Sequence, residues 1–185
     1  MIIKDQNTFN EILPTLDNHS VVVDVETNGF DSYGIHQICG IGIGFGNNSD
    51  SYYFPFRHQH VGTNLPSECL AALIAWLNKS KHLVGYNIKF DLRFLEKEGL
   101  VVKDKELVDV LTMVRLTEPS TVKDLDLTNT IKRSYGESHA SYDIETKKLL
   151  RSNKWHKDFS MAPVDVLGPY CEKDVIYTAK LYNDR

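Results

Sequence analysis

Short runs of hydrophobic residues in the first third of the chain predict three successive β-strands. Runs of this length, bounded by turn residues, are typical of strands rather than of helices. Gly46, Asn47 and Asn48 supply turn residues between the second run and the third. We therefore expect a meander of neighbouring strands, formed by VVVDVE (21–26), HQICGIGIGF (36–45) and SYYFPF (51–56).

Helical spacing of hydrophobic residues appears on both sides of this meander. A short helix over residues 7–17 precedes it, with Asn7 or Thr8 as the capping residue. The stretch PSECLAALIAWLNK (66–79) follows it and predicts an amphipathic helix whose start fits capping by Ser67.

Strand and helix then alternate. A short apolar strand over residues 82–86 leads into a helix over residues 87–99 that ends at Gly99. Helical periodicity continues almost to the end of the chain, over residues 108–117, 124–135, 143–152 and 169–182. This order of elements predicts one α/β domain over residues 1–185, with a mixed sheet flanked by helices.

The composition is that of a soluble globular protein, since 42% of the residues are hydrophobic and 10% are aromatic. No run approaches the roughly 20 apolar residues of a membrane span. The amino terminus lacks the pattern of a secretory signal. Cys39, Cys69 and Cys171 are scattered without metal-type spacing, which is typical of a reducing compartment. We expect a cytoplasmic protein with no membrane partner.

Two acidic residues interrupt the first predicted strand. Asp24 and Glu26 point to one face of it and Val23 and Val25 to the other, because successive strand residues alternate. Two like charges side by side repel and resist desolvation unless a positive charge lies between them. The pair therefore indicates a bound divalent cation, or alternatively a solvent-facing edge strand of alternating polarity.

Two further polar pairs are spaced four residues apart on predicted helices, which places each pair on one helix face. Asn87 and Asp91 form the first pair, and a capped surface helix with Asn87 as N-cap explains them equally well. Tyr170 and Asp174 form the second pair, after Pro169, which suits the first turn of a helix. A half-buried tyrosine is common, so this pair also has a purely structural explanation.

Together, the three motifs resemble the signature of the DEDD superfamily of 3′→5′ exonucleases, in its tyrosine-bearing branch. The histidine branch is disfavoured because Pro169 stands where its histidine would lie, five residues before Asp174. The resemblance covers about residues 20–182. More narrowly, the chain resembles the proofreading exonuclease domain of family-A DNA polymerases, with a bacteriophage character, in the phrases DVETNGF, GYNIKFD, KDLDLTNTIKRSYG and PYCEKDV.

The resemblance implies a ribonuclease-H-like fold and a catalytic site for two divalent cations. The four acids that match the metal site are Asp24, Glu26, Asp91 and Asp174. Their hard oxygen ligands suit Mg²⁺ or Mn²⁺, and no thiolate or imidazole cluster for zinc is evident. Tyr170 would orient the attacking water, since a phenol of pKa about 10 suits positioning better than general-base catalysis.

The resemblance also implies contacts with a substrate strand. Phe30 stands where the family often has a leucine against the terminal base and would stack there, although a core residue in a turn is the other interpretation. Asn87 would hydrogen-bond the substrate backbone, and Thr27 and Tyr142 are further candidates. The basic stretch KKLLRSNKWHK (147–157) indicates a path for a single strand or, alternatively, a solvated face.

The expected function is hydrolysis of phosphodiester bonds at the 3′ end of single-stranded DNA, with release of nucleoside monophosphates during proofreading and replication. A net charge of −4 argues against a protein that coats nucleic acid by electrostatics alone. The alternatives are an exoribonuclease of the ribonuclease D type and a non-catalytic module that binds nucleic acid. A polymerase domain or replisome protein is the expected partner, in the cytoplasm of a bacterial host.

Overall fold

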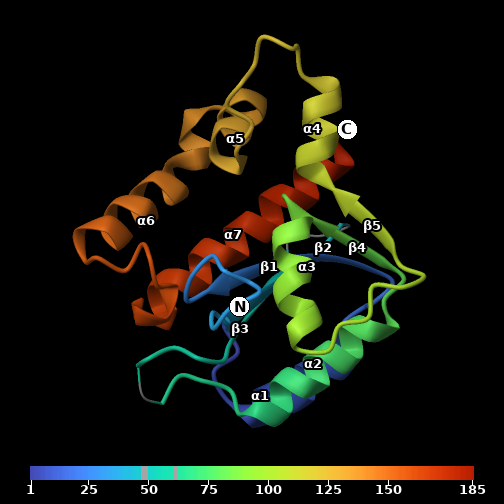
Figure 1. Cartoon of the computed structure of the whole chain (residues 1–185), viewed down its shortest axis with the longest axis vertical. Helices are drawn as coiled ribbons and strands as arrows, with labels where there is room; N and C mark the ends of the chain where they lie inside the picture. The colour runs from blue at the N-terminus through green and yellow to red at the C-terminus, as the bar shows by residue number, and fades with distance from the viewer. Residues whose placement is uncertain (47–49, 61) are drawn as a thin grey trace.

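A mixed sheet of five strands forms the centre of the computed structural model, which describes residues 1–46, 50–60 and 62–185 (Figure 1). The strand order is β3-β2-β1-β4-β5. β2 is antiparallel to both of its neighbours, β1 and β3, whereas β4 and β5 run parallel to β1. The predicted meander is confirmed, but Asn47 and Asn48 of its predicted turn lie outside the described residues. The strands are β1 (Ser20–Thr27), β2 (Ile38–Phe45), β3 (Ser51–Pro55), β4 (His82–Gly85) and β5 (Glu106–Asp109).

Helices cover both faces of the sheet, as the predicted α/β class requires (Figure 1). One face packs against α1, α2 and α3, and α7 crosses the other face, with α5 and α6 beyond it. The α-helices are α1 (Gln6–Ile12), α2 (Ser67–Lys79), α3 (Ile88–Lys97), α4 (Val110–Thr117), α5 (Leu127–Tyr135), α6 (Ser141–Ser152) and α7 (Val164–Asn183). Short 3-10 turns follow α1, precede α6 and precede α7, at η1 (Leu13–Thr15), η2 (Glu137–Ala140) and η3 (Phe159–Met161).

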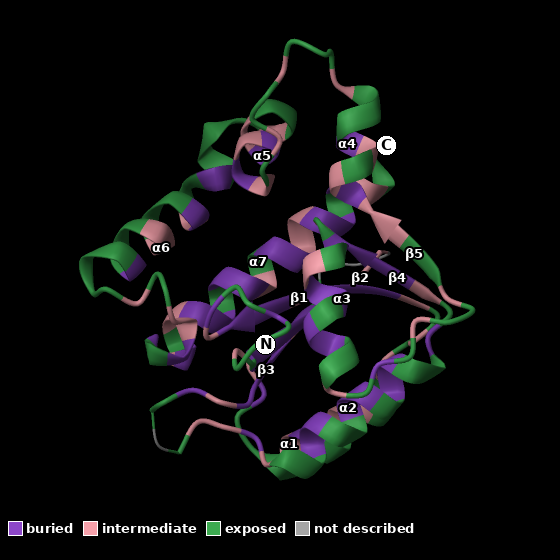
Figure 2. Ribbon diagram, in the orientation of Figure 1, coloured by how far each residue is buried: buried purple, intermediate pink, exposed green. Residues whose placement is uncertain are grey.

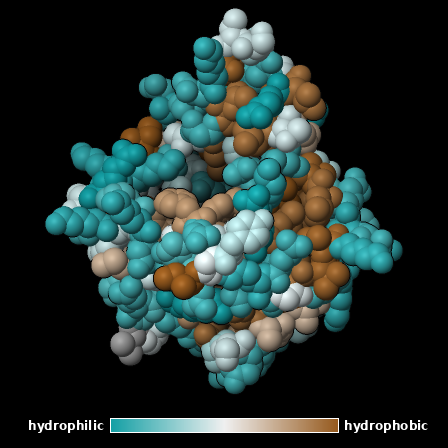
Figure 3. Space-filling view, in the orientation of Figure 1, coloured by the Kyte–Doolittle hydropathy of each residue, from teal (hydrophilic) through white to brown (hydrophobic). Residues whose placement is uncertain are grey.

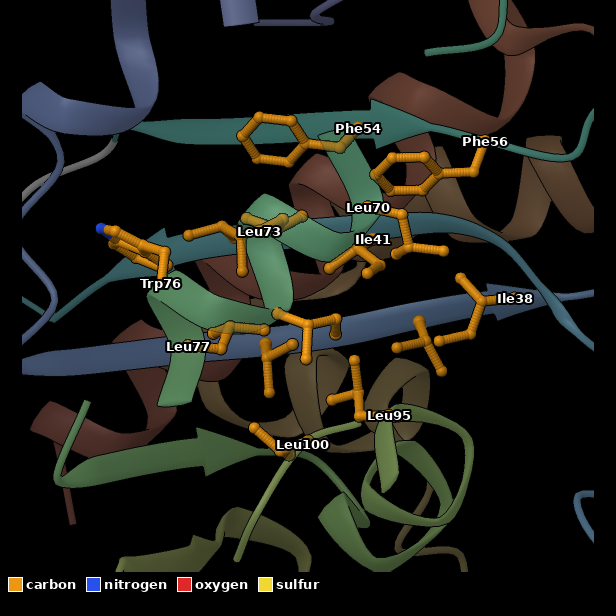
Figure 4. Packing of buried hydrophobic residues seen from close by; sticks show 14 of the residues in the cluster. Ile38, Ile41, Phe54, Phe56, Leu70, Leu73, Trp76, Leu77, Leu95 and Leu100 are labelled. Atoms are coloured by element: carbon orange, nitrogen blue, oxygen red, sulfur yellow. The ribbon is translucent and has the colours of Figure 1, made fainter. Parts of the chain in front are cut away.

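The largest hydrophobic core lies between the sheet and α2. Leu73 and Leu77 of α2 pack with Ile41 of β2 and Phe54 of β3, all of them buried (Figure 4). Burying a side chain of this size stabilises a fold by about 1.5–3 kcal/mol relative to its exposure. Figure 2 shows buried residues along the strands and mostly exposed or intermediate residues on α5 and α6. The sheet is therefore the rigid support on which the polar residues of β1 are held.

Two predicted helices begin at other residues. The helix predicted over residues 108–117 is present as α4 but begins at Val110, because the unpredicted strand β5 ends only at Asp109. This short strand lies at the sheet edge with Glu106 and Leu107 exposed, so it lacks the apolar pattern of a buried strand. The last helix begins at Val164 rather than at residue 169, and Pro169 therefore lies inside α7, where it cannot donate a helical hydrogen bond.

The helix starts also differ from the predicted caps. Ser67 begins α2 without a side-chain capping bond, and Pro66 precedes it. Asp5, rather than Asn7 or Thr8, caps α1 by accepting a hydrogen bond from the backbone N–H of Thr8 at 2.9 Å. Among the described residues, no helix combines the length and apolar character that crossing a bilayer requires.

Candidate active site

β1 presents Asp24 and Glu26 to the face of the sheet that α7 covers. Val21, Val23 and Val25 pack in the core beneath α2 and α3, so the alternating residues of β1 point the opposite way. The Sγ of Cys171 on α7 lies 3.3 Å from Asp24 Oδ2. The prediction that the two acids share one face is confirmed, and because β1 is a central strand the solvent-facing edge strand is excluded.

Glycines of β2 let α7 approach these acids closely. Gly42 pairs with Asp24 across the sheet, and Gly40 pairs with Glu26. A Cβ atom on Gly42 would lie 2.5 Å from the Sγ of Cys171, far inside van der Waals contact. In the alternation GIGIG, the isoleucines therefore face the hydrophobic core and the glycines face α7. Because the glycines have no side chains, α7 can lie close to the sheet and to the acids of β1. Sequence reasoning treated this run only as a strand.

Asp91 reaches the site from α3 by bonding to an open edge of β1. β4 pairs with β1 only from Ser20 to Val22, so the next backbone groups of β1 have no strand partner on that side. The backbone N–H of Val25 donates to Asp91 Oδ1 at 3.0 Å, and the Asp91 side chain is buried. The carboxylate therefore replaces a neighbouring strand at this point, which fixes it beside the acids of β1.

Asn87 stands at the start of α3 but does not cap it with its side chain. Its backbone is left-handed, with φ of 61°, and its side chain makes no capping hydrogen bond. Its backbone N–H instead donates to Asp109 Oδ1 at 2.8 Å. The prediction of an Asn87 side-chain cap is therefore wrong, and the exposed side chain is available for other contacts.

Tyr170 and Asp174 project from one face of α7, as their spacing predicts. Both side chains are buried. The Tyr142 hydroxyl donates to Asp174 Oδ1 at 2.6 Å, and the Tyr170 hydroxyl donates to Asp143 Oδ1 at 3.2 Å. Two consecutive residues of α6 therefore hold the two site residues of α7. Sequence reasoning missed Asp143, since an aspartate four residues before Lys147 is typical of an exposed helical ion pair.

The carboxylates of this site have raised pKa values. Burial, opposed by a hydrogen bond from Cys171, raises the pKa of Asp24 to about 6. Burial and the neighbouring Asp24 hold the pKa values of Glu26, Asp91 and Asp174 well above their ordinary range. No ion pair joins these four acids to a basic side chain in the described part of the chain. The site therefore concentrates negative charge, which the nearby Lys147 offsets only partly at Asp174.

The donor set fits divalent cations. The Glu26 Oε1 atom is buried and has no hydrogen-bond partner among the described residues. One oxygen of Asp24, one of Glu26 and the Sγ of Cys171 all lie within 4.8 Å of one another. Burial raises the pKa of the Cys171 thiol well above its usual range, so the thiol stays neutral and donates to Asp24. The remaining oxygens are hard ligands of the kind that Mg²⁺ and Mn²⁺ prefer.

Cys171 was not anticipated at this position. The scattered spacing of the cysteines gives it no role in a site, and the structure buries its side chain against Asp24. Its contact with Asp24 spans 147 residues of sequence. Two sequence features could have indicated this contact: Cys171 follows Tyr170 directly, and its helix packs against the glycines of β2.

The predicted substrate residues lie in different environments. Phe30 is 72% exposed, which excludes the core interpretation, and its ring centroid lies 6.5 Å from that of Phe90. Thr27 is buried and its hydroxyl donates to the Gly29 carbonyl at 2.7 Å. Tyr142 stacks on Tyr177 with 5.6 Å between ring centroids. Phe30 therefore presents an exposed aromatic ring, whereas Thr27 and Tyr142 already have partners within the protein.

A second feature is an open cavity of about 570 Å³ along α5 and α6. Three of its lining residues, Lys132, Lys148 and Arg151, form no ion pair with any residue that the structure describes, whereas Lys147 pairs with Asp143 at 2.9 Å. Figure 3 shows hydrophilic side chains over this lobe of the molecule. The basic stretch 147–157 thus contributes to a concave basic surface rather than to a uniformly solvated helix face. Asp143 lines the cavity and also bonds to Tyr170.

Comparisons with known proteins identify the family and the fold. The family model described as 3′-5′ exonuclease, of the DNA polymerase A type, matches residues 1–184. The crystal structure of the Nibbler EXO domain from Aedes aegypti is similar, with a TM-score of 0.53 and 15% identity over 73% of this chain and 67% of that chain. This likeness shows the fold, and the predicted ribonuclease-H-like architecture is confirmed. No curated protein sequence matches the chain. The match over residues 1–184 shows that the chain belongs to the family of 3′-5′ exonuclease domains.

Proposed function

We propose that the chain is a metal-dependent exonuclease that hydrolyses phosphodiester bonds at the 3′ end of single-stranded DNA and releases nucleoside monophosphates. The observation that carries this proposal is the convergence of four carboxylates from β1, α3 and α7 without a basic partner. Buried like charges are unfavourable unless cations neutralise them. Their arrangement is therefore explained by metal binding better than by stability.

The residues that would hold the cations are Asp24, Glu26, Asp91 and Asp174. Two divalent ions, when bound in such a site, supply an activated water and neutralise charge on the attacking and leaving oxygens. Among the described residues, Glu26 Oε1 accepts no hydrogen bond, so this oxygen can coordinate a cation without losing a partner. Cys171 contributes by donating to Asp24 and so fixes the orientation of that carboxylate.

Tyr170 acts on the attacking water as a neutral phenol. Burial and the adjacent Asp174 and Glu26 raise its pKa well above the usual value, so the hydroxyl remains protonated at neutral pH. A protonated phenol cannot serve as a general base, but it can orient a water by a hydrogen bond. Its role is therefore to position the water for in-line attack.

The substrate strand would be held by three groups of residues. Exposed Phe30 can stack on the terminal base, a contact of about 1–3 kcal/mol. The basic side chains of the α5–α6 cavity can bind phosphates of the preceding nucleotides. Exposed Asn87 can hydrogen-bond the backbone of the strand. In this role the domain would act in proofreading or replication, beside a polymerase domain or another replisome protein.

A digestion assay tests the proposal. Single-stranded DNA and RNA of the same sequence, labelled at the 5′ end, are incubated with the protein in Mg²⁺, in Mn²⁺ or in EDTA. We expect a ladder shortened one nucleotide at a time on DNA, dependent on metal and absent with Asp24→Ala. Faster digestion of RNA would reassign the substrate to the ribonuclease D type. No metal-dependent release from either strand would refute the proposal and favour a non-catalytic binding module.

A further inference from the structure

We propose that Asp143 is a positioning residue for Tyr170: it accepts the phenolic hydrogen, so that the phenol oxygen is left to accept a hydrogen bond from the attacking water. This inference rests on the proposed exonuclease function and assigns the direction of a hydrogen bond within it. Asp143 hydrogen-bonds to Tyr170 rather than binding the substrate in this role.

The geometry fixes the Asp143 carboxylate from three sides. Its Oδ1 accepts from the Tyr170 hydroxyl at 3.2 Å and pairs with Lys147 Nζ at 2.9 Å. Its Oδ2 accepts from the Thr128 hydroxyl at 2.6 Å. Lys147 Nζ also lies 3.0 Å from Thr128 Oγ1, which closes the network. The donors come from α5, α6 and α7, and the Asp143 side chain is only 5% exposed.

This network determines what the Tyr170 hydroxyl can do. A phenol has one hydrogen to donate, and its oxygen can also accept. Because the hydrogen is directed at Asp143, only the accepting lone pairs remain for a water on the metal side. A water that donates to Tyr170 turns its own lone pairs away from the ring, which is the orientation needed for attack. A hydroxyl free to rotate would hold this orientation for only part of the time.

A simpler explanation is that Asp143 merely stabilises the packing of α6 on α5. Lys147 and Thr128 would already satisfy a buried carboxylate, and their bonds remain if Tyr170 is replaced. The two explanations differ in one measurable respect. A packing residue affects catalysis independently of Tyr170, whereas a positioning residue acts only through its hydroxyl.

A double-mutant cycle in kinetics separates them. Asp143→Asn and Tyr170→Phe are measured singly and together on single-stranded DNA with Mg²⁺. We expect Tyr170→Phe to lower kcat by about 10- to 1,000-fold and Asp143→Asn by about 10- to 100-fold, with KM changed less than about threefold. In the Tyr170→Phe background, Asp143→Asn should change kcat by less than about twofold. Glu145→Gln, which removes an exposed acid from the same helix, is the matched control and should leave kcat unchanged.

A milder variant covers the case in which Asp143→Asn does not fold. Thr128→Val keeps the side-chain volume and removes one donor to Asp143, so it should lower kcat by about 3- to 10-fold in the parent and not in the Tyr170→Phe background. Additive losses in either cycle, or a loss confined to KM, would overturn the role of Asp143. An inactive parent protein would instead refute the proposed function, and with it this inference.

Discussion

Glu26 is almost fully buried beside Asp24, and one of its carboxylate oxygens has no hydrogen-bond partner. Folding places both residues against α7, where burial and mutual repulsion disfavour their charged forms. The residues that are proposed to bind metal therefore weaken the fold when no cation is present. This conflict between stability and function is measurable at a single residue.

Asp24→Asn should stabilise the metal-free protein at neutral pH. The pKa of Asp24 is about 6 against an ordinary 3.8, so the folded state holds this proton more tightly than the unfolded state. The resulting stabilisation is present below about pH 3.8 and is lost as the pH rises through about 6. At pH 7.5 in EDTA we expect the free energy of unfolding to increase by about 1–3 kcal/mol.

Denaturant unfolding at pH 7.5 and pH 3.5 provides the measurement, with exposed Asp124→Asn as the control. The gain from Asp24→Asn should disappear at pH 3.5, where both states are protonated. A variant that is less stable than the parent at pH 7.5 would contradict the assignment of unfavourable burial to Asp24.

At the scale of elements, the contact between β2 and α7 decides whether the site forms. Gly42→Ala would place a Cβ atom 2.5 Å from Cys171 Sγ and 3.1 Å from Val175 Cγ1. Overpacking of this kind costs about 1–3 kcal/mol, and here it would also displace Tyr170 and Asp174 from β1. We expect lower stability in thermal unfolding and weaker exonuclease activity.

Gly46→Ala is the control for this substitution, because its added atom meets nothing closer than 3.7 Å. Adding Cys171→Ala to Gly42→Ala should recover part of the lost stability by removing the nearest atom. Equal stability of Gly42→Ala and the parent would show that α7 does not depend on the glycine face.

The elements that carry the site could be predicted from the sequence to different degrees. Strand alternation placed Asp24 and Glu26 on one face correctly, and helical spacing did the same for Tyr170 and Asp174, because these are properties of the local backbone. The contacts of Cys171 and Asp143 could not be predicted, since they depend on how α7 packs against β2 and α6. The edge strand β5 was not predicted, because two of its residues are exposed and its sequence lacks the apolar pattern of a buried strand.

At the scale of the whole molecule, the balance of charge predicts how a strand is handled. The net charge is −4, and the basic side chains of the α5–α6 cavity are balanced in part by Asp126 and Asp143 of its lining. Affinity should therefore come mainly from the 3′ end, through the metal site and stacking on Phe30. We expect distributive digestion and a preference for single-stranded or frayed ends, since fraying a paired end costs a few kcal/mol.

Digestion of labelled DNA, with an excess of unlabelled strand added after binding, measures this behaviour. Phe30→Ala should weaken binding about 5- to 100-fold and reduce the preference for single strands. Ile35→Ala, another exposed apolar residue of the same loop region, should have little effect. Long uninterrupted digestion in the presence of the trap, or equal rates on blunt duplex and single strand, would indicate a more extensive binding surface.

If the four carboxylates bind divalent cations, calorimetric titration of the purified chain with Mn²⁺ should detect the binding. The parent protein should bind the ion with release of protons at pH 6, because the acids with raised pKa values must ionise to coordinate it. Asp24→Asn and Glu26→Gln should each abolish or strongly weaken binding, whereas exposed Asp124→Asn should bind as the parent does. Binding that is absent in the parent, or unchanged in Asp24→Asn and Glu26→Gln, would contradict the account.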